Sequence, residues 1–204
     1  MKISKKKFIY LISPNKIYPQ FYKDLKEILK TGKIGFFQMR LKKYSFKEKV
    51  LIGKKIQQIC KKNNTKFLVN DDPILSKKLN ADGCHLGQKD MDIKNARKII
   101  GNKIIGITCH NSIRLIKSAI KEKANYIAIG AFFSSKTKKV KFKATIKILN
   151  KVKKLTKVPI VAIGGINFDN YKKLLLNNAN LLAISGYIWN NKKYKPIESI
   201  KKLK

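Results

Sequence analysis

The sequence is short of acidic residues, with 11 aspartates and glutamates against 48 lysines and arginines in 204 residues. Glycine and proline are also sparse, at 11 and 5 residues, which excludes a collagen-like or a Pro/Gly-rich low-complexity chain. The longest apolar runs, such as residues 8–12, are far shorter than the roughly 20 residues that a membrane-spanning helix requires. No apolar region of a secretory signal follows the basic N-terminus. We therefore expect a cytoplasmic protein with no membrane partner.

Cysteines are few, widely spaced and odd in number. The three residues Cys60, Cys84 and Cys109 are expected to be reduced thiols. Cys84 and Cys109 each precede a histidine, a pairing that resembles metal ligands. Adjacent residues of a strand point to opposite faces, however, so we expect no zinc site and predict that Cys84 is a core residue. Gly-rich nucleotide-binding loops are also absent from the sequence.

The basic residues are nearly all of one kind. Three of them, Arg40, Arg97 and Arg114, are arginine and the other 45 are lysine, spread along the whole chain. A net charge of +37 suggests nucleic acid as a partner. Arginine, which forks onto phosphates and reads guanine edges, is too scarce to favour that hypothesis. We expect a solvated lysine surface whose field attracts small anionic substrates.

Aspartates cluster in one short segment of this basic chain. Five of the 11 acidic residues lie within the 22 residues from Asp71 to Asp92. Asp72 precedes a proline and Asp92 precedes a helical pattern, so both are expected to cap helix N-termini. Asp71 and Asp90 have no capping role. Because Mg²⁺ takes one or two carboxylates together with substrate phosphates, they are candidate metal ligands, with ordinary lysine partners as the alternative.

Short apolar runs alternate with amphipathic, lysine-rich stretches along the chain, which is 44% apolar. The predicted strands cover residues 8–13, 34–41, 66–70, 82–86, 103–109, 126–132, 159–165 and 181–187. The predicted helices cover residues 21–30, 46–62, 74–80, 92–100, 112–123, 144–155, 168–178 and 197–203, the second opened by a capping box at Ser45 and Glu48. Continuous apolar strands are typical of a parallel sheet buried on both faces. Eight strand–helix units of about 25 residues predict an α/β chain with one domain over residues 1–204, a (β/α)8 TIM barrel; a doubly wound open sheet is the alternative.

Polar residues lie where the predicted strands end, which is where a barrel of this kind carries its chemistry. They are Gln38, Arg40, Lys42, Asn70, Asp71, Gln88, Asp90, Thr108, residues 134–138, Gly164, Gly165 and Ser185. Gln38, Arg40 and Lys42 share one face of the second predicted strand at a period of two residues. Three polar groups there need polar or anionic partners. We expect ligand binding, with a merely polar strand face as the alternative.

Taken together, these segments resemble the thiamine phosphate synthase family. The resemblance covers about residues 8–190 and rests on residues 38–42 (QMRLK), 70–71 (ND), 81–90 (ADGCHLGQKD), 105–108 (IGIT), 130–138 and 162–166 (AIGGI). These motifs occur in the order and spacing of the family. Leu41 departs from it, because an acidic residue is common at that position, while Thr108 and Ser135 keep the hydroxyl of the usual residue.

The resemblance implies a (β/α)8 barrel that acts as a transferase in thiamine biosynthesis. Such an enzyme joins 4-amino-2-methyl-5-(diphosphooxymethyl)pyrimidine to a thiazole phosphate or its carboxylate. The products are thiamine phosphate and pyrophosphate, and Mg²⁺ is the cofactor. The leaving pyrophosphate yields a pyrimidinylmethyl cation that the thiazole nitrogen captures, so the resemblance implies no covalent protein nucleophile.

The resemblance also assigns roles to residues. Asp71 and Asp90 would hold Mg²⁺. The pyrimidine diphosphate would be bound by Gln38, Arg40, Lys42, Asn70, Thr108 and Lys138. The thiazole phosphate would be bound by Ser135, Lys136, Thr137, Gly165, Ile184 and Ser185.

Two other functions stay open as alternatives. A thiazole tautomerase of the same superfamily would have a general acid–base histidine directly after the glycine that ends the sixth strand, but Ala131 follows Gly130. His110 is a substitute base for that reaction, or simply a loop histidine bonded to backbone. The second alternative is a non-catalytic, nucleic-acid-associated protein that uses its lysines. The sequence leaves the oligomeric state open, a homo-oligomer included.

Overall fold

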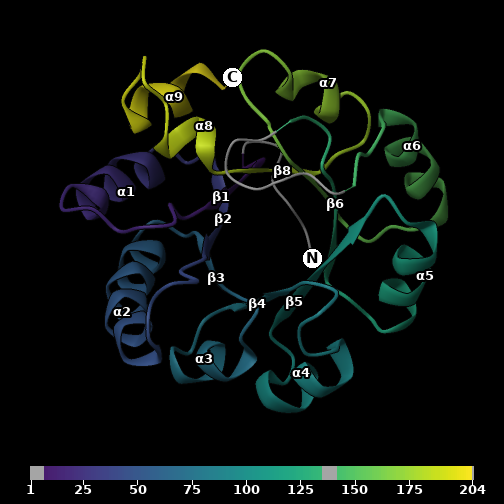
Figure 1. The fold of residues 1–204 in the computed structure, drawn as a ribbon, viewed down its shortest axis with the longest axis horizontal. Coiled ribbons are helices and arrows are strands. Elements are labelled where there is room, and N and C mark those ends of the chain that lie inside the picture. Colours follow the sequence, from purple (N-terminus) through teal and green to yellow (C-terminus); the bar gives the residue numbers. More distant parts are fainter. Residues whose placement is uncertain (1–6, 135–141, 204) are drawn as a thin grey trace.

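Eight parallel strands close into a barrel, and helices surround it (Figure 1). The structure is a computed structural model that describes residues 7–134 and 142–203. The strands are β1 (Ile9–Ile12), β2 (Ile34–Met39), β3 (Lys66–Asn70), β4 (Gly83–Leu86), β5 (Ile104–His110), β6 (Tyr126–Gly130), β7 (Ile160–Ile163) and β8 (Leu181–Ile184). The helices are α1 (Phe21–Lys30), α2 (Phe46–Lys62), α3 (Pro73–Lys78), α4 (Ile93–Ile100), α5 (Ile113–Lys121), α6 (Ile146–Leu155), α7 (Tyr171–Leu175), α8 (Gly186–Trp189) and α9 (Pro196–Lys202).

Closure of the sheet follows from its strand order. Each strand pairs in parallel with the next one in the sequence, and β8 returns to pair with β1. The predicted (β/α)8 barrel is therefore confirmed, and the open-sheet alternative is wrong. Neighbouring strands of such a barrel direct their carboxyl ends to the same side, so the loops after the strands form one face.

Alternation along the strands separates two apolar layers. In β2, Phe37 and Met39 pack against the helices, whereas Phe36 points into the barrel with Leu68 and Tyr126. This period of two residues is the ordinary geometry of a strand. Most strand residues are buried, because one layer faces the helices and the other fills the barrel. The continuous apolar runs in the sequence are the consequence.

Four strands end two or three residues earlier than predicted: β2, β6, β7 and β8 end at Met39, Gly130, Ile163 and Ile184 instead of at residues 41, 132, 165 and 187. β2 ends at Met39, because the Arg40 backbone N–H donates to the Ser13 side-chain oxygen (2.9 Å) and the chain leaves the sheet. Arg40 and Lys42 therefore lie in a loop rather than on one strand face with Gln38. The eighth strand ends at Ile184 instead of continuing to residue 187. The next residues form α8, whose Trp189 indole N–H donates to the Ile12 carbonyl (2.6 Å) at the end of β1.

All three cysteines are free, and all three are buried, which confirms the predicted core position of Cys84. Burial raises the pKa of the Cys84 and Cys109 thiols to about 12, so neither is a reactive thiolate at neutral pH. Among the described residues, no group of three or more histidines, cysteines, aspartates or glutamates is placed to hold a metal ion. Within the same residues, no helix is both long and apolar enough to cross a membrane.

Gly106 of β5 makes room for a tyrosine inside the barrel. A Cβ atom at this position would lie 1.8 Å from Cζ of Tyr126, whose ring is fully buried. No rotation of a rigid ring at the centre of a packed barrel relieves that overlap. A glycine here is therefore a packing requirement.

We predict that Gly106→Ala lowers the free energy of unfolding by about 3 kcal/mol, because the Tyr126 ring must be displaced. Urea denaturation followed by circular dichroism measures the loss. Gly32→Ala is the matched control, since nothing lies within 4 Å of its Cβ and only its positive φ of 70°, just after the end of α1, opposes the side chain. Its expected cost is about 1 kcal/mol. Equal losses in the two variants would contradict the packing argument.

Candidate active site

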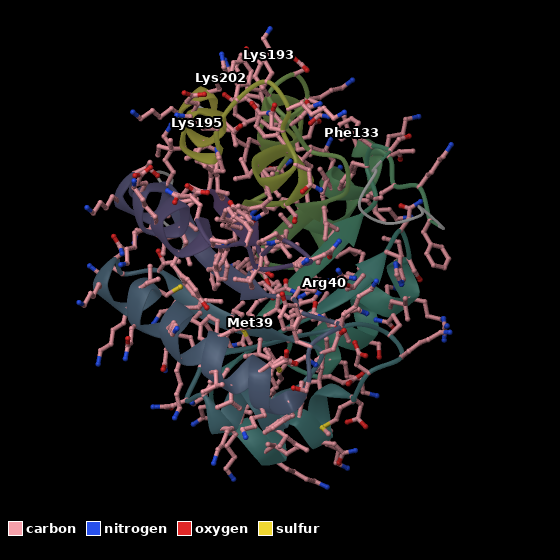
Figure 2. All side chains as sticks on the ribbon, turned by 60° about the vertical axis from the view of Figure 1, so that its left-hand side comes forward. Met39, Arg40, Phe133, Lys193, Lys195 and Lys202 are labelled. Carbon is pink, nitrogen blue, oxygen red and sulfur yellow. The ribbon has the colours of Figure 1, made fainter. Side chains whose placement is uncertain are left out.

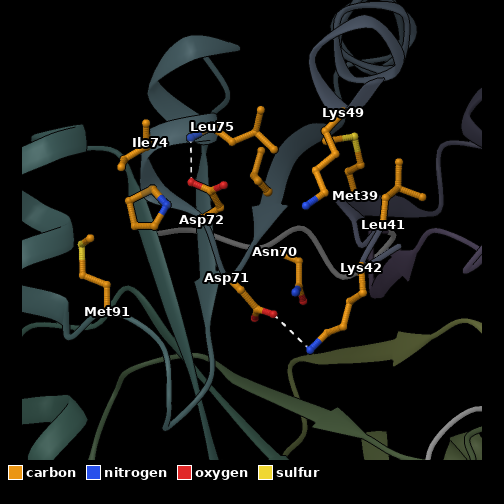
Figure 3. Close-up of a pocket in the computed structure, with 12 residues that line it drawn as sticks. Met39, Leu41, Lys42, Lys49, Asn70, Asp71, Asp72, Ile74, Leu75 and Met91 are labelled. Carbon is orange, nitrogen blue, oxygen red and sulfur yellow. Dashed lines mark hydrogen bonds and ion pairs between the residues drawn. The ribbon is translucent and has the colours of Figure 1, made fainter. Parts of the chain in front are cut away.

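A cluster of charged and polar side chains lies at the carboxyl ends of β2, β3 and β4. Figure 3 shows Asp71 and Lys42 joined beside Asn70, at the edge of a cavity of about 450 Å³. Lys49 extends into this cavity from α2, and Leu41 contributes an apolar wall. The ion-paired residues Lys42 and Asp71 come from two neighbouring loops, those after β2 and β3. The loops that follow parallel strands bring them together.

Asp71 is held in an unusual backbone conformation. Its φ is 64°, in the left-handed region that few residues other than glycine adopt. The Asp71 backbone N–H donates to the His85 carbonyl on β4 (2.8 Å), and its carboxylate lies 3.3 Å from the Lys42 ammonium. Strained residues of this kind are retained where the surrounding structure fixes them, often at functional sites.

Asp90 lies next to Asp71. Its carboxylate accepts a hydrogen bond from the Gly87 backbone N–H (2.7 Å), which closes the loop after β4. Burial raises the pKa of the Asp90 carboxyl, and a side-chain hydrogen bond with Asp71 raises that pKa further, while Lys42 opposes the shift. The two carboxylates are therefore close enough to repel each other, and one ammonium group offsets that repulsion in part.

The other aspartates of the segment have structural roles. The carboxylate of Asp72 accepts from the Leu75 backbone N–H (2.8 Å) at the start of α3, and that of Asp92 accepts from Asn95 (2.8 Å) at the start of α4. Both predicted N-caps are confirmed. Asp82 pairs with Lys66 at 2.7 Å. Only Asp71 and Asp90 of this segment keep carboxylates directed to one another.

A chain of hydrogen bonds runs through the inside of the barrel and links six side chains from six strands. In order, its members are Thr108, His85, Tyr126, Tyr10, Gln38 and Asn70. The two tyrosines are nearly inaccessible to solvent, and Gln38 and His85 are buried. Because buried polar groups are costly when unpaired, the chain satisfies each of them inside the barrel.

The contacts at the centre of the chain are short. Nδ1 of His85 lies 2.8 Å from the Tyr126 hydroxyl, which lies 2.8 Å from the Tyr10 hydroxyl. Tyr10 in turn donates to Oε1 of Gln38 at 2.7 Å. Burial raises the pKa of both tyrosine hydroxyls, so they stay protonated.

The two ends of the chain lie at the mouth of the barrel. Nε2 of His85 lies 2.8 Å from the Thr108 hydroxyl, and Nε2 of Gln38 donates to Oδ1 of Asn70. Burial lowers the pKa of His85 to about 4, which makes the imidazole neutral at physiological pH. Three residues expected to bind the pyrimidine are therefore connected through the barrel: Gln38, Asn70 and Thr108.

Gly165 and Ser185 lie in the loops after β7 and β8. Gly164 and Gly165 both have positive φ, at 106° and 61°. A Cβ at Gly165 would lie 2.2 Å from the Ser134 carbonyl, so the turn packs tightly against the loop after β6. The Ser185 hydroxyl donates to the Ser13 carbonyl (3.2 Å). Ile184 is buried at the end of β8.

Several predicted residues cannot be placed. Ser135, Lys136, Thr137 and Lys138 lie outside the described residues. Arg40 is at the mouth, where its guanidinium donates to the Asn15 side chain (3.2 Å). The structure thus brings the members of two predicted groups together. One group is Asp71 and Asp90 with Lys42, and the other is Gln38, Asn70 and Thr108. Their binding roles stay predictions.

Sequence reasoning missed Tyr10, Tyr126 and the role of His85. The available signal was polar side chains at inward positions of otherwise apolar strands. Without the strand partners, that signal does not show that the three side chains meet, because Tyr10 and Tyr126 are 116 positions apart.

Comparison with known proteins supports the resemblance seen in the motifs. A family model described as thiamine monophosphate synthase matches residues 9–188. A thiamine-phosphate synthase of Pelagibacter ubique (strain HTCC1062) is 66% identical over 200 residues, which cover 98% of this chain and 97% of the relative. Another, from Erythrobacter litoralis (strain HTCC2594), is 39% identical over 186 residues and covers 89% of this chain and 87% of the relative.

A solved structure agrees with the sequence relatives. The thiamine phosphate pyrophosphorylase from Pyrococcus furiosus is similar with a TM-score of 0.86 at 28% identity, covering 98% of this chain and 94% of that chain.

The buried neutral histidine predicts a pH dependence of stability. The pKa of His85 is about 4 in the folded chain and about 6.5 when unfolded, so the unfolded chain binds the extra proton as the pH falls between these values. Stability is therefore lost on acidification through this window. We predict that wild type loses about 2 kcal/mol more than His85→Gln between about pH 7.5 and pH 5. Urea denaturation at both pH values measures the difference, and parallel curves for the two proteins would refute it.

Proposed function

The chain belongs to the thiamine monophosphate synthase family and is a transferase of thiamine biosynthesis, and we propose that its reaction takes place at the carboxyl end of the barrel. The reaction joins a pyrimidinylmethyl diphosphate to a thiazole phosphate, giving thiamine phosphate and pyrophosphate. We place the reaction there because Asp71 and Asp90 form a pair of carboxylates beside Lys42, at the ends of neighbouring strands. The reduced, buried thiols fit a cytoplasmic location, which we also propose.

Asp71 and Asp90 fit a magnesium ion. Both offer hard oxygen donors, they are adjacent, and neither caps a helix. Mg²⁺ keeps several waters and substrate phosphate oxygens, so two protein carboxylates suffice. Mg²⁺ bound there would neutralise charge that gathers on the leaving diphosphate. Its positive charge would also relieve the repulsion from Asp71, which adds to burial in raising the pKa of Asp90.

Cationic side chains at the same end would bind the diphosphate. Arg40 and Lys42 follow β2, and Lys42 already faces Asp71. Lys49 adds a third positive charge to the cavity. These groups stabilise the departing pyrophosphate better than the bound ester, because negative charge on the bridging oxygen grows as the C–O bond breaks.

The second substrate would enter from the side of β7 and β8. The tight turn at Gly164 and Gly165 brings backbone close to the loop after β6, and Ser185 follows β8. Backbone N–H groups in such loops are common phosphate ligands of barrels. We propose that they hold the thiazole phosphate so that its ring nitrogen faces the pyrimidine methylene.

The bonding changes need no covalent protein intermediate. The C–O bond to the diphosphate breaks with its electron pair, the amino-substituted ring stabilises the resulting cation, and the thiazole nitrogen forms the new C–N bond. The protein's contribution is to align the two substrates and to exclude water from the cation. A general base is not required, because the attacking nitrogen carries no proton.

The tautomerase alternative is not supported by the histidine positions. Ala131 stands where that reaction requires an acid–base histidine, and His110 packs its ring against Phe142 with centroids 4.4 Å apart. The nucleic-acid alternative would call for a local basic surface. In Figure 2, nitrogen ends of side chains instead project on all sides of the outline.

We predict that Asp71→Asn and Asp90→Asn each lower kcat/KM by about 100-fold at saturating Mg²⁺, equivalent to about 3 kcal/mol. Formation of thiamine phosphate and pyrophosphate from both substrates is the assay. EDTA is expected to abolish activity in wild type, and added Mg²⁺ to restore it.

Asp72→Asn is the matched control for this experiment. It makes the same chemical change one position from Asp71, but asparagine caps a helix about as well as aspartate, so activity and stability should be unchanged. Unimpaired synthesis by Asp71→Asn and Asp90→Asn would show that the metal is held elsewhere. No product from wild type with both substrates and Mg²⁺ would remove the proposed function.

A further inference from the structure

The hydrogen-bond chain inside the barrel has one direction. Gln38 is oriented with Nε2 toward Asn70 and Oε1 toward Tyr10, so Tyr10 must donate its only proton to Gln38. The Tyr10 oxygen then accepts from Tyr126, the other hydroxyl in contact with it. Having given its proton to Tyr10, Tyr126 can only accept from His85.

This direction determines the tautomer of His85. Because Tyr126 needs a donor, the imidazole must carry its proton on Nδ1, and Nε2 is left as an acceptor. Nε2 faces the Thr108 hydroxyl at 2.8 Å, so Thr108 donates its proton inward to His85. The Thr108 oxygen then has lone pairs but no proton to offer at the mouth of the barrel.

At the other end of the hydrogen-bond chain, Asn70 offers donors instead of an acceptor. Oδ1 of Asn70 accepts from Gln38, which leaves the two N–H bonds of the Asn70 amide as donors. One N–H bond of Gln38 is also left over. The chain therefore presents donors near β2 and β3 and an acceptor on β5.

We propose that His85, with Tyr126 and Tyr10, is a positioning residue that fixes this direction, so that the mouth recognises a substrate edge carrying an amino donor beside a ring-nitrogen acceptor. Thr108 accepts from the amino group, and an amide N–H of Gln38 or Asn70 donates to the ring nitrogen. This rests on the proposed function, because an aminopyrimidine has such an edge. A 4-oxo pyrimidine presents the reverse pattern, a carbonyl acceptor beside a ring N–H donor.

The proposal makes a spectroscopic prediction that is independent of activity. The chain has only two histidines, His85 and His110, so ¹⁵N NMR of the imidazoles in the full-length protein is readily assigned with a His110→Gln variant. At neutral pH, His85 should be the neutral tautomer with its proton on Nδ1. A proton on Nε2 would mean that the chain runs the other way and would overturn the proposal, whether or not the enzyme makes thiamine phosphate.

Substrate discrimination gives the second test. The probes are the 4-amino and 4-oxo forms of the pyrimidinylmethyl monophosphate, used as competitive inhibitors. Wild type should bind the amino form at least about 10-fold more tightly, because the oxo form leaves buried polar groups mismatched. Tyr126→Phe cuts the chain at its centre and leaves the His85–Thr108 pair free to reverse. The preference should then fall to about 2-fold or less, with KM for the pyrimidine diphosphate raised and KM for the thiazole phosphate unchanged.

Two further variants complete the design. Tyr10→Phe cuts the chain on the other side of Tyr126 and should produce the same loss of preference. Tyr22→Phe removes a tyrosine hydroxyl on α1, outside the barrel, and should leave the preference intact. If Tyr126→Phe and Tyr10→Phe both retain the wild-type ratio of inhibition constants, His85 does not act by fixing a direction. If either variant fails to fold, the NMR tautomer in wild type still decides the question.

Discussion

The fold depends on the requirement that polar groups sealed inside a closed barrel find all their hydrogen-bond partners there. Tyr10 and Tyr126 bring two hydroxyls to the centre of the barrel, where they meet each other at 2.8 Å. A hydroxyl left unpaired at such a place costs about 1–3 kcal/mol. Gly106 provides the space for the Tyr126 ring. Nδ1 of His85 is the second hydrogen-bond partner of the Tyr126 hydroxyl. The barrel therefore admits few alternative arrangements of these side chains.

At the mouth of the barrel, the charged groups are paired less completely than the polar groups inside it. Among the described residues, the cation paired with Asp71 is Lys42, whose side chain is largely exposed, and burial together with Asp71 raises the pKa of Asp90. Two adjacent carboxylates repel each other, and the cation proposed above would relieve that repulsion if bound there. The paired interior and the unbalanced mouth meet at Asn70, which ends β3 directly before Asp71. The hydrogen bond from Gln38 to Asn70 thus joins the buried hydrogen-bond chain to the residue that precedes the Asp71 carboxylate.

The sequence predicted the barrel because burial on both faces produces continuous apolar runs, and α1 and α2 match their predicted bounds. The end of β8 was mispredicted, since Tyr187 belongs to a helical turn that Trp189 secures through a contact with distant β1. Asp71 and Asp90 were left as candidate metal ligands once Asp72 and Asp92 were assigned to helix N-caps. Such elimination works where acidic residues are rare. The hydrogen-bond chain could not be predicted, because its order along the barrel interior is not its order in the sequence.

The abundance of lysine has its own physical consequence. In the described part of the chain, the ion pairs are Lys42–Asp71 and Lys66–Asp82, so nearly all the positive charge is balanced only by solvent and counterions. One arginine, Arg97, holds several acceptors at once, because it bonds to the carbonyls of two residues after α4 and to the Asn125 side chain. Lysine alone would attract phosphorylated molecules to every face. The total charge therefore cannot distinguish one phosphorylated molecule from another, whereas the proposed site at the mouth combines fixed donors, acceptors and carboxylates.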